Sequence, residues 1–218
     1  MINHLFQHNG VSVDMLRLDA LHAWAPGNKW YKLQLNMVAA KQAGARTLLS
    51  FGGAYSNHLH ALAAVTSCQD ISAVGLVRAD INAVLTPTLQ DAVGWGMKLH
   101  CLSRSDYRRR HDPIFVRDLM AQYPYSFLIP EGGANLLGAQ GCRDIVDLIP
   151  ECGRNYDTIV LACGTGTTLA GMSVKVAEGV KLLGVAVMKA EVFLARDIEL
   201  MLTGLGGDRG NWRLEHRF

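Results

Sequence analysis

Residues 47–77 read TLLSFGGAYSNHLHALAAVTSCQDISAVGLV, and this stretch decides the fold class. Its apolar start, TLLSF (47–51), predicts a buried strand that ends at a pair of glycines. The run SNHLHALAAVTSC (56–68) then predicts a helix, and SAVGLV (72–77) predicts a second strand. A strand, a helix and a strand in this order form a βαβ unit, in which the two strands lie parallel.

The same alternation continues along the chain. Further helices are expected at residues 86–94, 113–123, 140–148 and 168–177, and further strands at 98–102, 126–130, 157–164 and 181–187. This order predicts a two-lobed, three-layer α/β fold with parallel sheets. Residues 202–218 have turn chemistry but no run long enough for a closing strand or helix, so the second sheet is expected to be incomplete at the C-terminus.

Composition limits the function classes. Half of the 218 residues are hydrophobic, and the formal net charge of +2 gives no argument for a nucleic-acid partner. The basic run Arg108–Arg110 lacks interleaved aromatic residues and is interpreted as a solvated loop before a helix. Five scattered cysteines favour a reducing compartment, and neither a signal peptide nor a membrane-spanning run is evident. These features predict a cytoplasmic protein that has no membrane partner.

A glycine-threonine loop is the first candidate site. The predicted strand at 157–164 ends in two glycines and three threonines: Gly164, Thr165, Gly166, Thr167 and Thr168. Backbone N–H groups, hydroxyls and the positive end of a helix dipole together suit a phosphate group. No lysine follows the second glycine and Leu169 is not small, so the loop is neither a Walker A motif nor a full dinucleotide fingerprint. A glycine turn that merely packs a helix on a strand remains the alternative.

The glycine pair at residues 52–53 marks a second candidate site. Ser56, Asn57 and His58 fall in the first turn of the next predicted helix, where free N–H groups are able to hold a carboxylate. Taken alone, Ser56 and Asn57 are better explained as ordinary N-capping residues. His58 and His60 point about 200° apart on a helix, so no metal site is predicted.

Lys29 and Lys32 form the third candidate site. They follow Asn28, a good N-cap, at the start of a predicted helix, where the helix dipole disfavours an ammonium group. A solvated surface pair is the ordinary fate of lysine. A partly buried lysine would instead lose its proton more easily, and a neutral amine is what condensation with a carbonyl requires. A phosphate-binding loop, an amine and a site that holds a carboxylate have one common explanation. This explanation is pyridoxal phosphate with an amino-acid substrate.

Four blocks, in order and spacing, carry a resemblance to a known family. They are MLRLDALHAWAPGNKWYKL (15–33), TLLSFGGAYSNHLHALAA (47–64), IPEGGANLLGAQG (129–141) and LACGTGTTLAGM (161–172). The chain resembles the family of 1-aminocyclopropane-1-carboxylate deaminase and D-cysteine desulfhydrase. This is a fold-type II pyridoxal-phosphate family akin to the tryptophan synthase β subunit.

The resemblance implies a role for each candidate residue. Lys29 would form the Schiff base with pyridoxal phosphate and act as base, and Lys32 would support it. Asn57 would bind the cofactor's ring hydroxyl, Ser56 would lie beside the substrate, and the backbone N–H of His58 would hold the substrate carboxylate. The glycine-threonine loop would bind the cofactor phosphate. The implied reaction converts a small amino acid to a 2-oxo acid and ammonia.

The resemblance also implies a large lobe of residues 1–42 and 128–218 and a small inserted lobe of residues 43–127, with the cofactor between them. Family members continue past NWRL (211–214), and that continuation carries the partner of the pyridine nitrogen and a substrate-gripping aromatic residue. We therefore expect a C-terminally truncated chain. The substrate stays open, and the family suggests a homodimer. Leu59-His60 and Ala134 depart from the family's usual residues.

Three functions remain open at this point. The first is a pyridoxal-phosphate lyase or deaminase that acts through Lys29 on D-cysteine or 1-aminocyclopropane-1-carboxylate. The second is a truncated, catalytically impaired protein that binds pyridoxal phosphate or another phosphate ligand. The third is a nucleotide-binding α/β module that uses only the loop at residues 164–168.

Overall fold

The structure is a computed structural model that describes residues 1–23, 25–79, 84–187, 191–207 and 210–216. The chain forms two compact units. The first unit comprises residues 1–35 and 134–218, and the second comprises residues 36–133. The division falls inside helix α1 (Lys29–Gln42).

The lobe boundary expected at residues 127/128 would cut through strand β6 (Ser126–Ile129). This strand pairs with β3 along its whole length, because Thr47 to Ser50 lie opposite Ser126 to Ile129. All of β6 therefore belongs to the second unit. The sequence pattern predicted the position of this strand, but it did not show that the strand pairs with β3.

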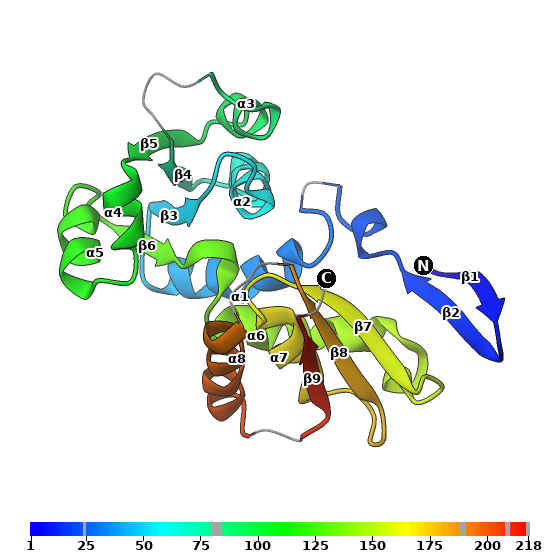
Figure 1. Ribbon diagram of the computed structural model, residues 1–218. Helices are drawn as coiled ribbons and strands as arrows, with labels where there is room; N and C mark the ends of the chain where they lie inside the picture. The colour runs from blue at the N-terminus through cyan, green and yellow to red at the C-terminus, as the bar shows by residue number, and fades with distance from the viewer. Residues whose placement is uncertain (24, 80–83, 188–190, 208–209, 217–218) are drawn as a thin grey trace. The chain divides into compact units, whose positions relative to one another are not determined.

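The second unit is built on a parallel sheet of four strands in the order β5-β4-β3-β6 (Figure 1). Its elements are β3 (Thr47–Gly52), α2 (Asn57–Ser67), β4 (Ser72–Arg78), α3 (Pro87–Gly94), β5 (Lys98–Leu102), α4 (Arg104–Arg108), α5 (Pro113–Met120), β6 and the 3-10 turn η2 (Glu131–Gly133). The parallel pairing of β3 with β4 through α2 confirms the βαβ unit predicted from residues 47–77.

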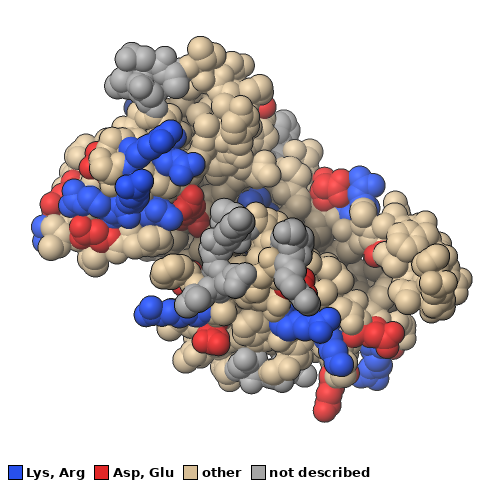
Figure 2. Space-filling model, viewed as in Figure 1, with Lys and Arg blue, Asp and Glu red and all other residues tan. Residues whose placement is uncertain are grey.

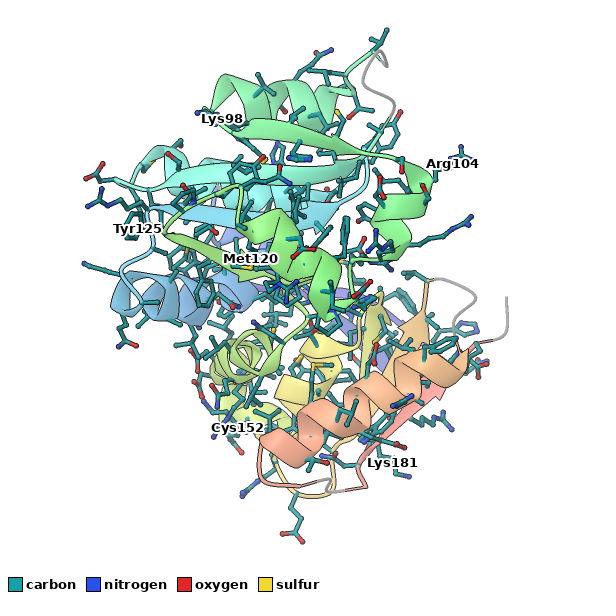
Figure 3. The ribbon with its side chains drawn as sticks, turned by 90° about the vertical axis from the view of Figure 1, so that its left-hand side faces the viewer. Lys98, Arg104, Met120, Tyr125, Cys152 and Lys181 are labelled. Atoms are coloured by element: carbon teal, nitrogen blue, oxygen red, sulfur yellow. The ribbon has the colours of Figure 1, made fainter. Side chains whose placement is uncertain are left out.

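Strand β3 shows why this sheet needs helices on both faces. Successive side chains of a strand point to opposite sides. Leu49 and Phe51 join a buried cluster with residues of α4 and α5, and Met120 packs against its border (Figure 3). Ser50 faces the other way, towards α2, where its hydroxyl lies 3.1 Å from Nε2 of His58. The second unit therefore has the predicted three layers of helix, sheet and helix.

The first unit contains a parallel sheet of three strands in the order β7-β8-β9 and an antiparallel hairpin (Figure 1). Its elements are the hairpin β1 (Ile2–His8) and β2 (Val11–Leu16), η1 (Leu18–Ala20), α6 (Leu136–Cys142), η3 (Arg143–Leu148), η4 (Pro150–Gly153), β7 (Thr158–Cys163), α7 (Thr167–Ser173), β8 (Lys181–Ala186), α8 (Glu191–Gly204) and β9 (Trp212–Glu215). The four-stranded sheet of the second unit and the three-stranded sheet of the first unit confirm the predicted α/β class with parallel strands.

The prediction that residues 202–218 hold no closing strand was wrong. Strand β9 has four residues and pairs in parallel with β8, so that Trp212 lies opposite Leu182. Four residues give too few alternations to separate a strand from a loop, and the pairing partner lies some 30 residues earlier in the chain. Residues 208–209 and 217–218 of that stretch lie outside the described residues.

Three predicted helices have different bounds, and one of them, expected at residues 113–123, ends at Met120. The helix expected at residues 140–148 is a short α6 that begins after Asn135 and then tightens into η3. The Asn135 side chain caps α6 by accepting a hydrogen bond from the backbone N–H of Gly138 at 2.8 Å. The helix expected at residues 168–177 ends at Ser173, whose carbonyl accepts a hydrogen bond from the side-chain amide of Asn211. That contact crosses 38 residues and has no local signal.

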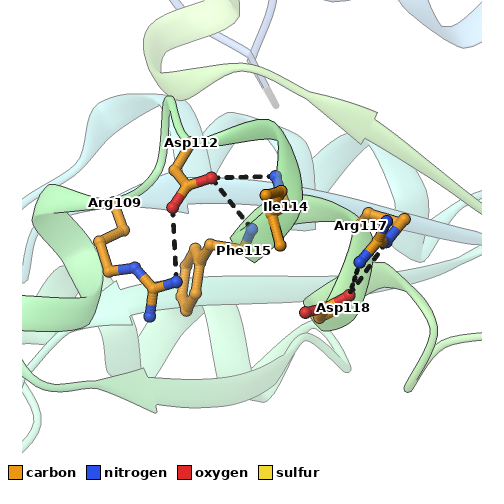
Figure 4. A network of polar contacts seen from close by, with 6 residues as sticks. All are labelled: Arg109, Asp112, Ile114, Phe115, Arg117 and Asp118. Carbon is orange, nitrogen blue, oxygen red and sulfur yellow. Dashed lines mark hydrogen bonds and ion pairs between the residues drawn. The ribbon is translucent and has the colours of Figure 1, made fainter.

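The basic run Arg108–Arg110 lies mostly in a turn before α5, as predicted, because only Arg108 belongs to the end of helix α4. Figure 2 shows blue side chains gathered over α4 and α5, with red carboxylates among them. The Nη2 atom of Arg109 lies 3.4 Å from Oδ2 of Asp112 (Figure 4). Asp112 also caps α5, because its Oδ1 atom accepts hydrogen bonds from the N–H groups of Ile114 and Phe115. Two further ion pairs are Arg110 with Glu131 and Arg117 with Asp118. Much of this positive charge is thus balanced by neighbouring carboxylates.

None of the described helices is both long and apolar enough to cross a membrane.

Candidate functional site

The candidate site lies in the first unit, where the beginning of α1 contacts the beginning of α7. The Nζ atom of Lys32 donates a hydrogen bond to Oγ1 of Thr165 at 3.1 Å, across 133 residues. The side-chain amide of Asn28 donates to Oγ1 of Thr168 at 2.8 Å, across 140 residues. Two motifs that the sequence identified separately are therefore joined by direct hydrogen bonds.

Close packing of α6 against α1 helps to place the two lysines. A Cβ atom on Gly141 would lie 2.0 Å from the backbone oxygen of Tyr31, so only glycine fits there. Tyr31 is itself buried in the main core of this unit, together with Cys142 and Leu169. The first turn of α1 is thus packed against α6, in the same core as α7, the helix that follows the threonine loop.

Lys32 is a buried cation. Lys32 is only 4% exposed. The interpretation of the two lysines as a solvated surface pair is therefore wrong for Lys32. Burial, and secondarily the nearby charge of Lys29, lower the pKa of Lys32 to about 8. At neutral pH the amine is still mostly protonated, and it can lose its proton in mild base.

Lys29 is the first residue of α1, as expected for a helix that begins after Asn28. Its Nζ atom donates to Oδ1 of Asn28 at 2.9 Å. Burial lowers the pKa of Lys29 from its ordinary value, because an ammonium group loses solvation when it leaves water. The position therefore has the property that the sequence argument required, an amine that deprotonates more easily than a surface lysine.

Two thiols lie near these amines and are neutral at physiological pH. Burial raises the pKa of Cys142, and it raises the pKa of Cys163 to about 11. A protonated thiol carries no charge, so neither cysteine counters the positive charge of the lysines near pH 7. Cys142 also lies against the loop, since its Sγ atom is 3.9 Å from Oγ1 of Thr168.

The glycine-threonine loop is well packed. Gly166 has a φ of 70° and precedes the first residue of α7. Thr165 and Thr167 share a hydrogen bond between their hydroxyl oxygens at 2.9 Å, and Thr167 is fully buried. The packing interpretation thus accounts for Gly166, whereas it gives no reason for three threonines whose hydroxyls lie at the start of one helix. The loop is compatible with both interpretations.

Alanine at position 166 is expected to lower the free energy of unfolding by about 2 kcal/mol, because it adds a left-handed backbone penalty to a steric clash. The new Cβ would lie 2.3 Å from Cγ1 of Ile198 on α8. Gly164→Ala is the matched control, since among the described residues its Cβ would meet only Val187, at 3.9 Å. Urea denaturation of both variants measures the difference. Equal stabilities would show that the loop adapts and that Gly166 is not needed for packing.

The second candidate site lies in the second unit, and its residues have local partners. The hydroxyl of Ser56 accepts a hydrogen bond from the N–H of Leu59 at 3.2 Å, so Ser56 is the N-cap of α2. His58 is buried against Ser50, and His60 contacts Asp91 at 3.3 Å. The two histidines thus have separate environments. Among the described residues, no group of three or more potential metal ligands is found.

Sequence reasoning missed the bridging role of the Asn28 side chain and the position of Cys142. Asn28 was expected only as an N-cap, because capping is the local use of asparagine before a helix. Cys142 has no motif around it and is fully buried. Both contacts depend on α7, which is far away in the sequence, so no local pattern would have revealed them.

Comparison with known proteins adds independent information. No protein-family model matches the chain. An inferred 1-aminocyclopropane-1-carboxylate deaminase of Thermotoga maritima is 30% identical over 176 residues, which cover 79% of this chain and 56% of that protein. The bifunctional D-cysteine desulfhydrase/1-aminocyclopropane-1-carboxylate deaminase of Arabidopsis thaliana is 29% identical over 181 residues, which cover 76% and 45%. The crystal structure of an ACC deaminase homologue superposes with a TM-score of 0.74 at 26% identity and covers 95% of this chain and 65% of that one.

The fold is thus that of the fold-type II pyridoxal-phosphate enzymes, an α/β class with parallel sheets. Within that class, the chain is a homologue of 1-aminocyclopropane-1-carboxylate deaminase and D-cysteine desulfhydrase, as the four sequence blocks indicated. It spans about half the length of the curated relatives that it matches, namely 56% of one and 45% of the other.

Proposed function

We propose that this chain carries the pyridoxal-phosphate site of an enzyme that converts a small amino acid, of the D-cysteine or 1-aminocyclopropane-1-carboxylate type, to a 2-oxo acid and ammonia. With D-cysteine the reaction also releases sulfide. One observation carries the proposal: a half-buried amine, Lys29, is linked through Asn28 to the threonine loop at the start of α7. The names of the two relatives support the choice of substrates.

The residues of the first unit fit such a cofactor. The loop of Gly164, Thr165, Gly166, Thr167 and Thr168 offers hydroxyls and N–H groups that donate to phosphate oxygens. The buried ammonium of Lys32, which contacts Thr165, supplies the positive charge that a phosphate requires. When bound, pyridoxal phosphate supplies an aldehyde that condenses with amines and a ring that withdraws electrons from Cα of the substrate.

We assign two roles to Lys29. Its amine holds the cofactor, and it is the base that removes a proton from the substrate. A base works best when its pKa lies near the working pH, and burial moves the pKa of Lys29 in that direction. Ser56, Asn57 and His58 are proposed for the substrate and the cofactor ring from the family resemblance. The position of Ser56 and Asn57 at the beginning of α2, at the positive end of a helix dipole, supports that assignment.

The direct test is turnover by the purified chain after loading with pyridoxal phosphate. D-cysteine is expected to yield sulfide, ammonia and a 2-oxo acid in equal amounts, and 1-aminocyclopropane-1-carboxylate to yield ammonia and a 2-oxo acid. A solution of pyridoxal phosphate without protein is the control, because the free cofactor itself slowly degrades amino acids. L-cysteine tests whether the site selects one configuration.

Three outcomes separate the competing functions. Turnover above the cofactor control supports the enzyme. Cofactor capture on Lys29 without turnover of either substrate would favour the catalytically impaired binding protein instead. If a mononucleotide bound in calorimetry while pyridoxal phosphate did not, the nucleotide-binding module would replace both.

A further inference from the structure

We propose that Asn28 is the positioning residue for Lys29, because its side chain connects the amine to the threonine loop. Its Oδ1 atom accepts from Nζ of Lys29 at 2.9 Å, and its Nδ2 atom donates to Oγ1 of Thr168 at 2.8 Å. This inference rests on the proposed function of Lys29. It assigns a role to Asn28 beyond the capping expected from its place before a helix.

The orientation of the amide follows from its neighbours. An ammonium group can only donate hydrogen bonds, so the carbonyl oxygen of Asn28 must face Lys29. The NH₂ group then faces Thr168, whose oxygen is able to accept. A flipped amide would place two donors against each other at Lys29. Both ends of the Asn28 side chain are therefore satisfied in a single arrangement.

The two anchors of this link are themselves fixed. The backbone oxygen of Asn28 accepts the N–H of Lys32 at 3.2 Å in the first turn of α1. Thr168 is only 8% exposed, and the thiol of Cys142 lies 3.9 Å from its hydroxyl oxygen. An anchored asparagine restricts the rotamers of the Lys29 side chain, which would otherwise lose considerable entropy when it reacts.

An amide also has an advantage over a carboxylate at position 28, because it is uncharged. Hydrogen bonding to a neutral amide orients the amine without adding a negative charge, whereas aspartate of the same shape would stabilise the ammonium form. In the part of the chain that the structure describes, the titratable groups near Lys29 are Lys32 on the same helix and Cys142 on α6, and neither is an anion near pH 7. Asn28 therefore allows Lys29 to be held in place and to remain easy to deprotonate.

The test is the pH dependence of Lys29 acetylation in the cofactor-free protein, measured by competitive labelling with acetic anhydride and mass spectrometry. In Asn28→Asp, the midpoint for Lys29 is expected to rise by about one pH unit or more. In Asn28→Ala it is not expected to rise, while the rate of borohydride-trapped pyridoxal-phosphate capture falls about tenfold. Lys41, exposed in the last turn of α1, is the internal standard in each sample.

The outcomes distinguish this inference from the proposed function. An unchanged Lys29 midpoint in a folded Asn28→Asp protein would overturn the inference, even if the wild type captures the cofactor. Unchanged capture by Asn28→Ala would also overturn it. A raised midpoint, in a protein whose wild type captures no pyridoxal phosphate, would support the link between Asn28 and Lys29 and reject the cofactor function.

Discussion

Lys29→Ala is expected to abolish covalent capture of pyridoxal phosphate while the chain still folds. In the wild type, borohydride should leave a pyridoxyl group on the peptide that contains Lys29, and in the variant that label should fall by about 100-fold or more. The reason is that burial makes Lys29 easier to deprotonate and Asn28 holds its amine in place. Peptide mapping by mass spectrometry measures the label, and circular dichroism confirms the fold.

Lys41→Ala is the matched control for this experiment. Lys41 lies in the last turn of the same helix and is exposed, so its loss should leave the labelling unchanged. Label that moves to Lys32 in the Lys29→Ala protein would show that the two buried amines are interchangeable. Full labelling of the variant at other lysines would mean that capture is non-specific and that the assignment of Lys29 is wrong.

The sequence predicted the fold class well because its signals were local and repeated. The stretch 47–77 contains two apolar strands, a glycine turn and a helix, and each has a characteristic pattern within a few residues. Among the elements that it missed are the hairpin of β1 and β2, the 14-residue helix α8 and the four-residue strand β9. The hairpin of β1 and β2 has mostly exposed residues, so no hydrophobic alternation marks it. Strand β9 gains its definition only by pairing with β8.

The candidate site was predictable in parts but not as an arrangement. Unusual residues at helix starts identified Lys29 and the threonine loop one at a time. The hydrogen bonds from Lys32 to Thr165 and from Asn28 to Thr168 cross more than 130 residues, and no spacing in the sequence encodes such a contact. The depth of burial of Lys32 was equally hidden, because it depends on the packing of α6 and α7 around α1.

Lys32→Met is expected to make the cofactor-free protein more stable at pH 7. The pKa of Lys32 is about 8 in the folded chain against an ordinary value of 10.5. Below about pH 8 both states carry the proton, and the folded state bears the full cost of the buried charge, about 3 kcal/mol. Methionine has a similar length and no charge. Loss of the hydrogen bond to Thr165 offsets about 1 kcal/mol of the gain.

The pH dependence gives this prediction its sign. Between about pH 8 and 10.5 the unfolded chain binds more protons at Lys32 than the folded chain, so the stability of the wild type rises with pH. Urea denaturation should therefore show an advantage of about 2 kcal/mol for Lys32→Met at pH 7 that shrinks as the pH approaches 10. Lys41→Met should show no such trend. An advantage that is absent at pH 7 would mean that other interactions in the folded chain compensate the cost of burying the Lys32 ammonium.

If the advantage is present and the affinity of Lys32→Met for pyridoxal phosphate falls about 100-fold, then the chain keeps a destabilising ammonium because the phosphate requires it.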